Sequence, residues 1–333
     1  MKAMQIKKYS KDINVEVANI PIPNISDNEI LIKVKAAAVN PLEILILTGS
    51  VRLIQDYKMP LTLGNECSGV VESVGKNVTD SKVGDKVYTR LPISKIGAFA
   101  EYVAVDSKFV SLMPKDYDFI TSAAIPLTAL TAYQAFTEEL EAKPGESVLI
   151  TGGSGSFGEL AVPIAKYLGL NVIVSGNERL KEHFINLGVD KYISYNKENY
   201  SEFVSNVDYV IDTLGANEFD KELSVLKKGG RLLSLRTSPN KKFAEDNKLS
   251  FFKKLLFSLA GSKYDKKAMK EQKEYRFMFV RADGVQLNKI TKIVEDKNIK
   301  PKIYSTVFNI DNASEALKTV IKKHTDGKII ISM

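Results

Sequence analysis

Three glycines at regular spacing, Gly152, Gly155 and Gly158, lie between a short β-branched apolar run and a segment with apolar residues at helical spacing. This order predicts a strand at residues 147–151, a tight turn and a helix with its apolar stripe from Leu160. Glycines in such a turn permit positive φ and leave room where a pyrophosphate meets the backbone. We therefore predict that the turn binds a dinucleotide through Gly152, Gly153, Ser154, Gly155, Ser156, Phe157 and Gly158. The alternative is a glycine-rich turn between any strand and helix.

The residues after this turn alternate between buried strand patterns and helical patterns. A helix is predicted at residues 178–187, and further strands are predicted at residues 171–175, 191–195, 207–213, 230–235 and 275–280. Strands separated by helices at this spacing indicate a doubly wound parallel sheet, which is the Rossmann arrangement.

Composition is that of a soluble globular protein with about two domains. The chain has 333 residues, of which 44% are hydrophobic and 26% charged. No apolar run approaches the roughly 20 residues of a membrane span, and the N-terminus lacks a signal-peptide core, so we expect a cytoplasmic protein. The single cysteine, Cys67, excludes an internal disulfide and a Cys-rich structural zinc lobe.

The net charge of +7 does not indicate nucleic-acid binding, because its excess is local. Residues 240–276 contain eleven Lys/Arg and five Asp/Glu. No basic face interleaved with exposed aromatic residues is evident elsewhere, so we expect no nucleic-acid partner.

The N-terminal part, residues 1–124, has the pattern of short strands with glycine turns that is typical of a small barrel. Alternating strands are predicted at residues 29–39 and 97–105, and a short helix at residues 42–47 follows Asn40-Pro41.

The segments GNECSGVVESVG (64–75) and TAYQAF (131–136), followed by the glycine turn, resemble the medium-chain dehydrogenase/reductase superfamily. VNPLEILILTG (39–49) and FMFVRADG (277–284) are most similar to its zinc-free quinone-oxidoreductase and enone-reductase branch. The resemblance implies an α/β chain with a GroES-like β-barrel catalytic domain, residues 1–124 with 282–333, and a Rossmann domain, residues 125–281. The C-terminal tail is then helix, strand (302–308), helix, strand (328–333).

Zinc alcohol dehydrogenases of the superfamily carry a cysteine at the position of Asn40 and a histidine at that of Asn65. Two neutral amides are poor zinc ligands, so we expect no metal. The two histidines, His183 and His324, are expected at the surface rather than as ligands.

Without a metal, the resemblance implies hydride transfer to a quinone or an α,β-unsaturated carbonyl. Asn40 is the first candidate to donate a hydrogen bond to the acceptor oxygen; the alternative is that it only caps the helix that begins at Pro41. Tyr57 is a candidate proton donor, or else an ordinary loop aromatic. The rival function is an NADPH-binding redox-sensing or structural protein with little turnover. Alcohol dehydrogenation would need the metal.

The end of the second strand of the nucleotide fold has no acid to hold a ribose diol. By resemblance to the NADPH-using branch, the contacts to a 2′-phosphate would be Ser175, Asn177, Arg179, Lys181 and Tyr195. The alternative places the basic residues on a solvated helix face and turns Glu178 towards the ribose.

The resemblance assigns further cofactor contacts to Thr131, Thr213, Leu214, Gly215, Phe279 and Arg281. Thr131 has the alternative of an ordinary helix-start threonine, and Phe279 that of a core residue. The FMFV segment at a sheet edge favours a homodimer that pairs across a two-fold axis.

Residues 251–260, FFKKLLFSLA, place five apolar side chains on one helical face. The interpretations are a lid over the substrate mouth, a subunit contact or an amphipathic membrane-surface segment. Core packing with a solvated basic face is the default expectation, and membrane association through this segment is the less favoured one.

Overall fold

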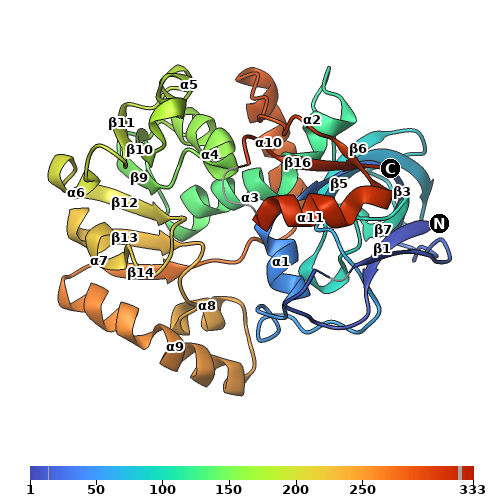
Figure 1. The fold of residues 1–333 in the computed structure, drawn as a ribbon, viewed down its shortest axis with the longest axis horizontal. Coiled ribbons are helices and arrows are strands. Elements are labelled where there is room, and N and C mark those ends of the chain that lie inside the picture. The colour runs from blue at the N-terminus through green and yellow to red at the C-terminus, as the bar shows by residue number, and fades with distance from the viewer. Residues whose placement is uncertain (14, 322–324) are drawn as a thin grey trace. The chain divides into compact units, whose positions relative to one another are not determined.

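The computed structural model describes residues 1–13, 15–321 and 325–333, so the prediction for His324 lies outside the described residues. Its ribbon is drawn in Figure 1. Two compact units can be separated: unit 1 is residues 1–130 with 281–333, and unit 2 is residues 131–280. Residues 125–130, which the sequence placed with the nucleotide-binding domain, fall in unit 1.

Unit 1 is built on a seven-stranded sheet in the order β15-β16-β3-β5-β6-β8, with β7 paired to β3, and a three-stranded sheet in the order β2-β1-β4. The strands of unit 1 are β1 (Lys2–Ile6), β2 (Glu16–Asn19), β3 (Glu29–Val39), β4 (Leu61–Thr62), β5 (Glu66–Val74), β6 (Lys86–Arg90), β7 (Tyr102–Asp106), β8 (Val110–Leu112), β15 (Phe308–Asn309) and β16 (Ile329–Ser332). Its α-helices are α1 (Pro41–Leu47), α2 (Phe119–Ala123), α10 (Gly284–Asp296) and α11 (Ala313–Ile321).

The long strand β3 is the centre of this sheet. Its alternating apolar residues are buried, and it pairs antiparallel with β5, β7 and the C-terminal strand β16. Residues from the two ends of the chain therefore meet in one sheet, as the resemblance implied.

Two strand predictions in unit 1 differ from the structure. The strand predicted at residues 302–308 is wrong: Ile303 forms one isolated bridge, and only Phe308 belongs to a strand, β15. Of the predicted strand 97–105, regular pairing begins at Tyr102, because the preceding backbone instead bonds to loop residues such as Gly64.

Unit 2 is a six-stranded sheet in the order β11-β10-β9-β12-β13-β14, and every neighbouring pair is parallel. This is the doubly wound order of the Rossmann fold, so the predicted fold class is confirmed. The strands are β9 (Ser147–Thr151), β10 (Asn171–Gly176), β11 (Lys191–Ser194), β12 (Val207–Asp212), β13 (Leu226–Ser234) and β14 (Glu274–Phe277). The α-helices are α4 (Ser156–Tyr167), α5 (Lys181–Asn186), α6 (Tyr200–Phe203), α7 (Phe219–Val225), α8 (Lys241–Asp246) and α9 (Phe251–Lys270); α3 (Pro126–Gln134) crosses from unit 1 into unit 2.

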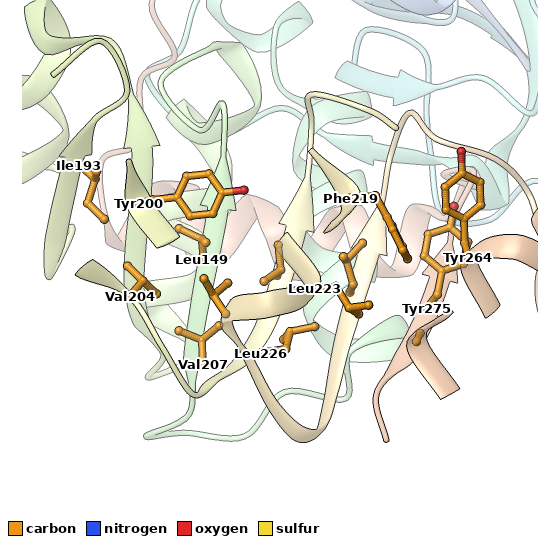
Figure 2. Packing of buried hydrophobic residues seen from close by; sticks show 14 residues of the cluster. Leu149, Ile193, Tyr200, Val204, Val207, Phe219, Leu223, Leu226, Tyr264 and Tyr275 are labelled. Atoms are coloured by element: carbon orange, nitrogen blue, oxygen red, sulfur yellow. The ribbon is translucent and has the colours of Figure 1, made fainter. Parts of the chain in front are cut away.

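One face of the unit 2 sheet is covered by residues of α6, α7 and α9, which Figure 2 shows in close-up. Phe219 packs edge-on against Tyr264 and Tyr275, with ring centroids 4.8 and 5.6 Å away. The strand predicted at residues 275–280 ends early, at Phe277, so Phe279 does not belong to it. None of the described helices is both long and apolar enough to cross a bilayer.

Candidate functional site

The start of helix α1 in unit 1 is held by a buried carboxylate. Asn40 is the N-cap residue, and its backbone N–H donates to Glu43 Oε2 at 2.6 Å. Glu43 Oε1 accepts from Asn65, from the backbone N–H at 3.1 Å and from Nδ2 at 2.6 Å. The backbone of Asn40 and both the backbone and the side chain of Asn65 are thus joined through the Glu43 carboxylate in the first turn of α1.

The side-chain amide of Asn40 is engaged at both ends. Its Nδ2 donates to Glu66 Oε1 at 2.9 Å and more weakly to the Ala38 carbonyl at 3.4 Å. Its Oδ1 accepts from Lys328 Nζ at 2.6 Å. Both polar atoms of the Asn40 side chain are therefore hydrogen-bonded to other residues of the protein.

Lys328 and Glu66 form a buried ion pair at 3.0 Å, with side chains 6% and 0% exposed. The ammonium also donates to Thr128 Oγ1 at 3.0 Å, and the second carboxylate oxygen of Glu66 accepts from the Leu127 N–H at 2.7 Å. Both charges thus keep hydrogen-bond partners, which is the condition for tolerating a buried ion pair.

This donor set does not fit a zinc ion. Asn40 and Asn65 offer neutral amides, and the Glu66 carboxylate already binds an ammonium. Zinc sites use thiolate, imidazole or carboxylate ligands. Within the described ranges, no group of three His, Cys, Asp or Glu side chains has the geometry of a metal site.

Arg90 lies beside this cluster and is not satisfied by it. It stands directly opposite Glu66 in the β5–β6 ladder, so both side chains project from the same face. The residue is fully buried, and Nη1 donates to the Leu91 carbonyl. Its Nε and Nη2 are buried without a hydrogen-bond partner in the described structure. A charged group left this way is costly and rare in proteins.

Tyr57 also has a buried polar side-chain atom without a hydrogen-bond partner in the described structure. Its backbone N–H is held by Tyr9 Oη at 2.8 Å, but its own Oη is buried without a partner among the described residues. Asn65 Oδ1, a hydrogen-bond acceptor, is also buried without a partner in the described structure. The buried donors of Arg90 and Tyr57 therefore keep the capacity to bind a polar group of a ligand.

Burial sets the charge of this region. It lowers the pKa of Arg90 to about 10, so the guanidinium remains cationic at neutral pH. It raises the pKa of Glu43 to about 7, and it raises the pKa of Tyr57 above its usual range. Arg90 therefore adds a buried positive charge beside Glu66, and burial favours the protonated form of Glu43. A buried positive charge of this kind suits an oxygen that gains negative charge.

The glycine turn in unit 2 has the geometry that a phosphate cradle needs. Gly152 has φ +63°, and a Cβ there would lie 2.6 Å from Thr213 Oγ1. At Gly158 a Cβ would collide with the Gly153 carbonyl, so helix α4 packs directly on the turn. Gly155, in contrast, faces open space, with nothing nearer than 3.9 Å, and no side chain caps α4. The free first-turn N–H groups and the open side fit a pyrophosphate.

The end of β10 is tied to this turn. The backbone N–H of Asn177 donates to Ser154 Oγ at 2.9 Å, and the Gly153 N–H donates to the Ser175 carbonyl at 3.0 Å. Asn177 Nδ2 lies 3.4 Å from Tyr195 Oη. Ser154, Ser175, Asn177 and Tyr195 are therefore brought together, although Ser175 itself is buried.

The charged residues after β10 divide into two groups. Arg179 is exposed, its backbone N–H is capped by Asn177 Oδ1 at 3.1 Å, and Lys181 begins α5 two residues later. The Glu178 carboxylate instead accepts from Ser194 Oγ and, at 3.1 Å, from Lys197 Nζ. The acid that was the alternative ribose ligand is therefore held by other side chains.

The turn Thr213-Leu214-Gly215 is fixed by Asp212. Asp212 Oδ1 accepts from the Leu214 and Gly215 N–H groups, both at 2.7 Å. Thr213 Oγ1 donates to the Thr151 carbonyl at 2.7 Å, which joins the ends of β12 and β9. This is the point where the strand order of the sheet reverses, the usual ligand crevice of such sheets.

The remaining predicted residues are more scattered. Thr131 is half-buried in the middle of α3, so it is not a helix-start threonine. Phe279 follows the end of β14 in unit 2 and is half-buried. Arg281 is exposed in unit 1, with its guanidinium 3.4 Å from Asp283 Oδ2.

Strand β14 lies at the edge of the unit 2 sheet, as predicted, and the homodimer stays a prediction. His183 is exposed and bonds to Glu159 at 2.9 Å.

A buried acid below the glycine turn gives a prediction for stability. Glu222 on α7 accepts from Thr151 Oγ1 at 2.5 Å, while its Oε2 has no partner in the described structure. Burial, and next the charge of Asp212, raise the pKa of Glu222 from 4.5 to about 9. The folded protein must therefore keep a proton on Glu222 that the unfolded chain releases, so stability falls as pH rises from 4.5 to 9.

Glu222→Gln is expected to remove this dependence. The variant should match the wild type near pH 5 and gain up to about 1.4 kcal/mol of relative stability per pH unit above it. Urea unfolding at several pH values measures this difference. Glu202→Gln, at an exposed position of the same unit, should leave the pH dependence unchanged. Parallel wild-type and Glu222→Gln curves would contradict the assignment.

Sequence reasoning missed Arg90 and Lys328. Arg90 ends a predicted barrel segment in which it looks like a surface charge, and Lys328 precedes the apolar run of β16. The only signal in the sequence was a charged residue at a position where strand alternation indicates burial.

Comparison with known proteins places these features in a family. The alcohol dehydrogenase GroES-like domain matches residues 26–115, and the zinc-binding dehydrogenase family matches residues 187–331. The 2-methylene-furan-3-one reductase of Solanum lycopersicum is 33% identical over 99% of this chain and 79% of its own length. The NADPH-dependent alkenal/one oxidoreductase of Arabidopsis thaliana, which is chloroplastic, is 33% identical over 99% and 80%.

The similarity to solved structures indicates the same family. The quinone oxidoreductase of Coxiella burnetii superposes with a TM-score of 0.84 at 25% identity, covering 100% of this chain and 99% of that one. Together, the two sheets, the glycine turn and the end-to-end matches show that the chain belongs to the medium-chain dehydrogenase/reductase superfamily, in its quinone-oxidoreductase and alkenal/one-oxidoreductase branch.

Proposed function

We propose that this protein is an NADPH-dependent reductase of quinones or α,β-unsaturated carbonyls that works without a metal ion. The observation that carries the proposal is the buried cluster of Asn40, Glu66 and Lys328. By resemblance, the amides of Asn40 and Asn65 occupy the positions at which zinc enzymes of the superfamily have a cysteine and a histidine, and the Lys328 ammonium binds directly to Asn40 and Glu66. The proposal is supported by the names of the tomato and Arabidopsis relatives, a 2-methylene-furan-3-one reductase and an NADPH-dependent alkenal/one oxidoreductase.

The nucleotide is proposed to bind to unit 2. The open glycine turn and the uncapped start of α4 would hold the pyrophosphate, and the Asp212-fixed turn would border the ribose. When bound, the cofactor supplies a hydride. The protein's part is to hold the acceptor and to stabilise the charge that develops on it.

The preference for NADPH rests on the end of β10. Asn177, Arg179 and Tyr195 offer donors to a 2′-phosphate, and Lys181 adds a positive charge nearby. Glu178, the alternative ribose ligand, is engaged by Ser194 and Lys197.

The acceptor oxygen is proposed to bind to Arg90 and Tyr57. Hydride addition to a conjugated acceptor moves negative charge to a distant oxygen, and donors aimed at that oxygen lower the barrier. The unpartnered Arg90 Nε and Nη2 supply charged N–H groups, and the Tyr57 phenol, neutral at physiological pH, supplies an O–H. Asn40 is a weaker candidate donor, because its Nδ2 already donates to Glu66 Oε1 and, at 3.4 Å, to the Ala38 carbonyl, which the acceptor oxygen would have to replace.

One assay tests cofactor and acceptor together. We expect NADPH to be oxidised in the presence of naphthoquinones, 2-alkenals or vinyl ketones, and NADPH to bind at least about tenfold tighter than NADH, about 1.4 kcal/mol. Cofactor absorbance and a binding titration measure the two quantities. Equal affinities would contradict the NADPH assignment. Binding of NADPH without oxidation by any acceptor would favour a redox-sensing or structural role instead.

A further inference from the structure

Helix α9 in unit 2 is a 20-residue helix with one firmly buried face. Phe257, Gly261, Tyr264 and Ala268, spaced by three or four residues, are its buried positions. Tyr264 packs against Tyr275 of β14 with the ring centroids 5.3 Å apart and the ring planes tilted by 34°. Both rings are labelled in Figure 2. A Cβ at Gly261 would lie 2.5 Å from Asn240 Cβ, so the backbone of α9 packs directly against Asn240, the N-cap residue of α8. These contacts fix which side of α9 faces outwards.

The outward side of its first half is apolar. The exposed fractions are 84% for Phe251, 70% for Phe252, 51% for Leu255 and 69% for Leu259. At 100° per residue these four side chains lie within an arc of about 100°, opposite the buried face. The expectation that this stripe packs in the core is therefore wrong: the helix buries a different set of residues. An exposed stripe of four large apolar side chains marks an interaction surface.

The outward side of its second half is basic. Lys263, Lys266 and Lys270 continue the same arc and are exposed, and Met269 beside them is 71% exposed. The helix carries six lysines and one acidic residue, Asp265, which accepts a hydrogen bond from Asn240 Nδ2 at 2.8 Å. The second half thus presents a concentrated positive charge next to the apolar half.

We propose that this outward face of α9, named here the α9 face, docks on an anionic phospholipid surface. The four apolar side chains would enter the boundary between headgroups and acyl chains, while the lysines bind headgroup phosphates. Both halves of the face are then used. A second copy of the chain is a poorer occupant, because pairing the apolar halves leaves the basic halves without counter-charges, and pairing the basic halves brings lysines together.

Vesicle co-sedimentation of the full chain tests the proposal. We expect the protein to pellet with phosphatidylcholine–phosphatidylserine vesicles and not with phosphatidylcholine alone, and to be released by salt. Phe251→Ser combined with Leu255→Ser should weaken binding about tenfold or more, because the apolar insertion is lost. Lys263→Glu, Lys266→Glu and Lys270→Glu together should do the same by reversing the charge.

Matched controls lie elsewhere on the chain. Val83→Ser with Ile185→Ser removes exposed apolar side chains of 63% and 48% exposure, and should not change vesicle binding. Charge reversal at three exposed lysines outside the helix supplies the electrostatic control: Lys8→Glu, Lys82→Glu and Lys297→Glu. Thermal unfolding checks that each variant is folded.

Three results would overturn the proposal. The first is a wild-type protein that stays in solution with anionic vesicles at low salt. The second is equal loss of binding in the α9 variants and in their controls. The third is a concentration-dependent dimer that the Phe251→Ser/Leu255→Ser variant abolishes while vesicle binding is absent, since that would assign the face to a second copy. NADPH oxidation in solution is a separate readout, so failure here leaves the proposed reductase function untouched.

Discussion

Lys328→Met is expected to lower the free energy of unfolding by about 3–5 kcal/mol. The substitution removes the ammonium that faces Glu66 at 3.0 Å, and it leaves a fully buried carboxylate without its ion-pair partner. It also takes the donor from Asn40 Oδ1 and Thr128 Oγ1. Urea unfolding of the full chain measures the change.

The control for this variant is a lysine in the same C-terminal segment. Lys302 pairs with Asp326 at 2.6 Å, but the two side chains are 44% and 68% exposed, so Lys302→Met should cost no more than about 1 kcal/mol. Adding Glu66→Gln to Lys328→Met removes both charges and should recover part of the loss. A Lys328→Met protein as stable as Lys302→Met would show that the ion pair does not hold this cluster together.

Arg90→Met is expected to lower kcat/KM for a quinone or enone by about 10²–10³, the usual effect of losing one donor to a developing oxyanion. NADPH affinity should be unchanged, because no cofactor contact is removed. The free energy of unfolding should stay within about 1 kcal/mol of the wild-type value or rise, since methionine replaces a guanidinium with two unpartnered nitrogens. Activity and stability therefore change in different directions, which a purely structural role would not produce.

Two further variants sharpen this test. Arg90→Lys keeps the charge but loses the paired N–H groups, so its kcat/KM should lie between those of the wild type and Arg90→Met. Tyr57→Phe removes only the buried hydroxyl and should have a smaller effect on kcat. If Arg90→Met unfolds easily, and activity returns in Arg90→Lys in step with stability so that the folded fraction alone accounts for the activity of each variant, Arg90 is a structural residue and the acceptor binds elsewhere.

Much of unit 2 could be predicted from the sequence because its signals are local. Residues 147–177 contain the glycine turn after β9, the buried strand β10 and the end of β10 that lacks an acid. Parallel sheets with connecting helices also leave regular spacing in the chain. The boundary of β14 was less accurate, because an apolar run does not show where pairing stops.

The cluster in unit 1 could not be predicted in the same way. Asn40 and Lys328 are separated by 288 positions, and their contact depends on β16 returning to pair with β3. A lysine before an apolar strand looks the same in sequence whether it is buried or solvated. For α9, periodicity correctly indicated a helix with an apolar stripe, but the buried face contains Phe257 from that segment and continues through Gly261, Tyr264 and Ala268 beyond it.

The most direct test of the central claim is to follow the hydride itself. Chelator-treated protein, shown to be free of zinc by elemental analysis, would be given NADPH deuterated at the nicotinamide C4 position and an enone. We predict that deuterium appears at the β-carbon of the product in proportion to the NADPH consumed. Activity that disappears with the metal and returns with added zinc, or deuterium found at a carbinol carbon, would contradict the account.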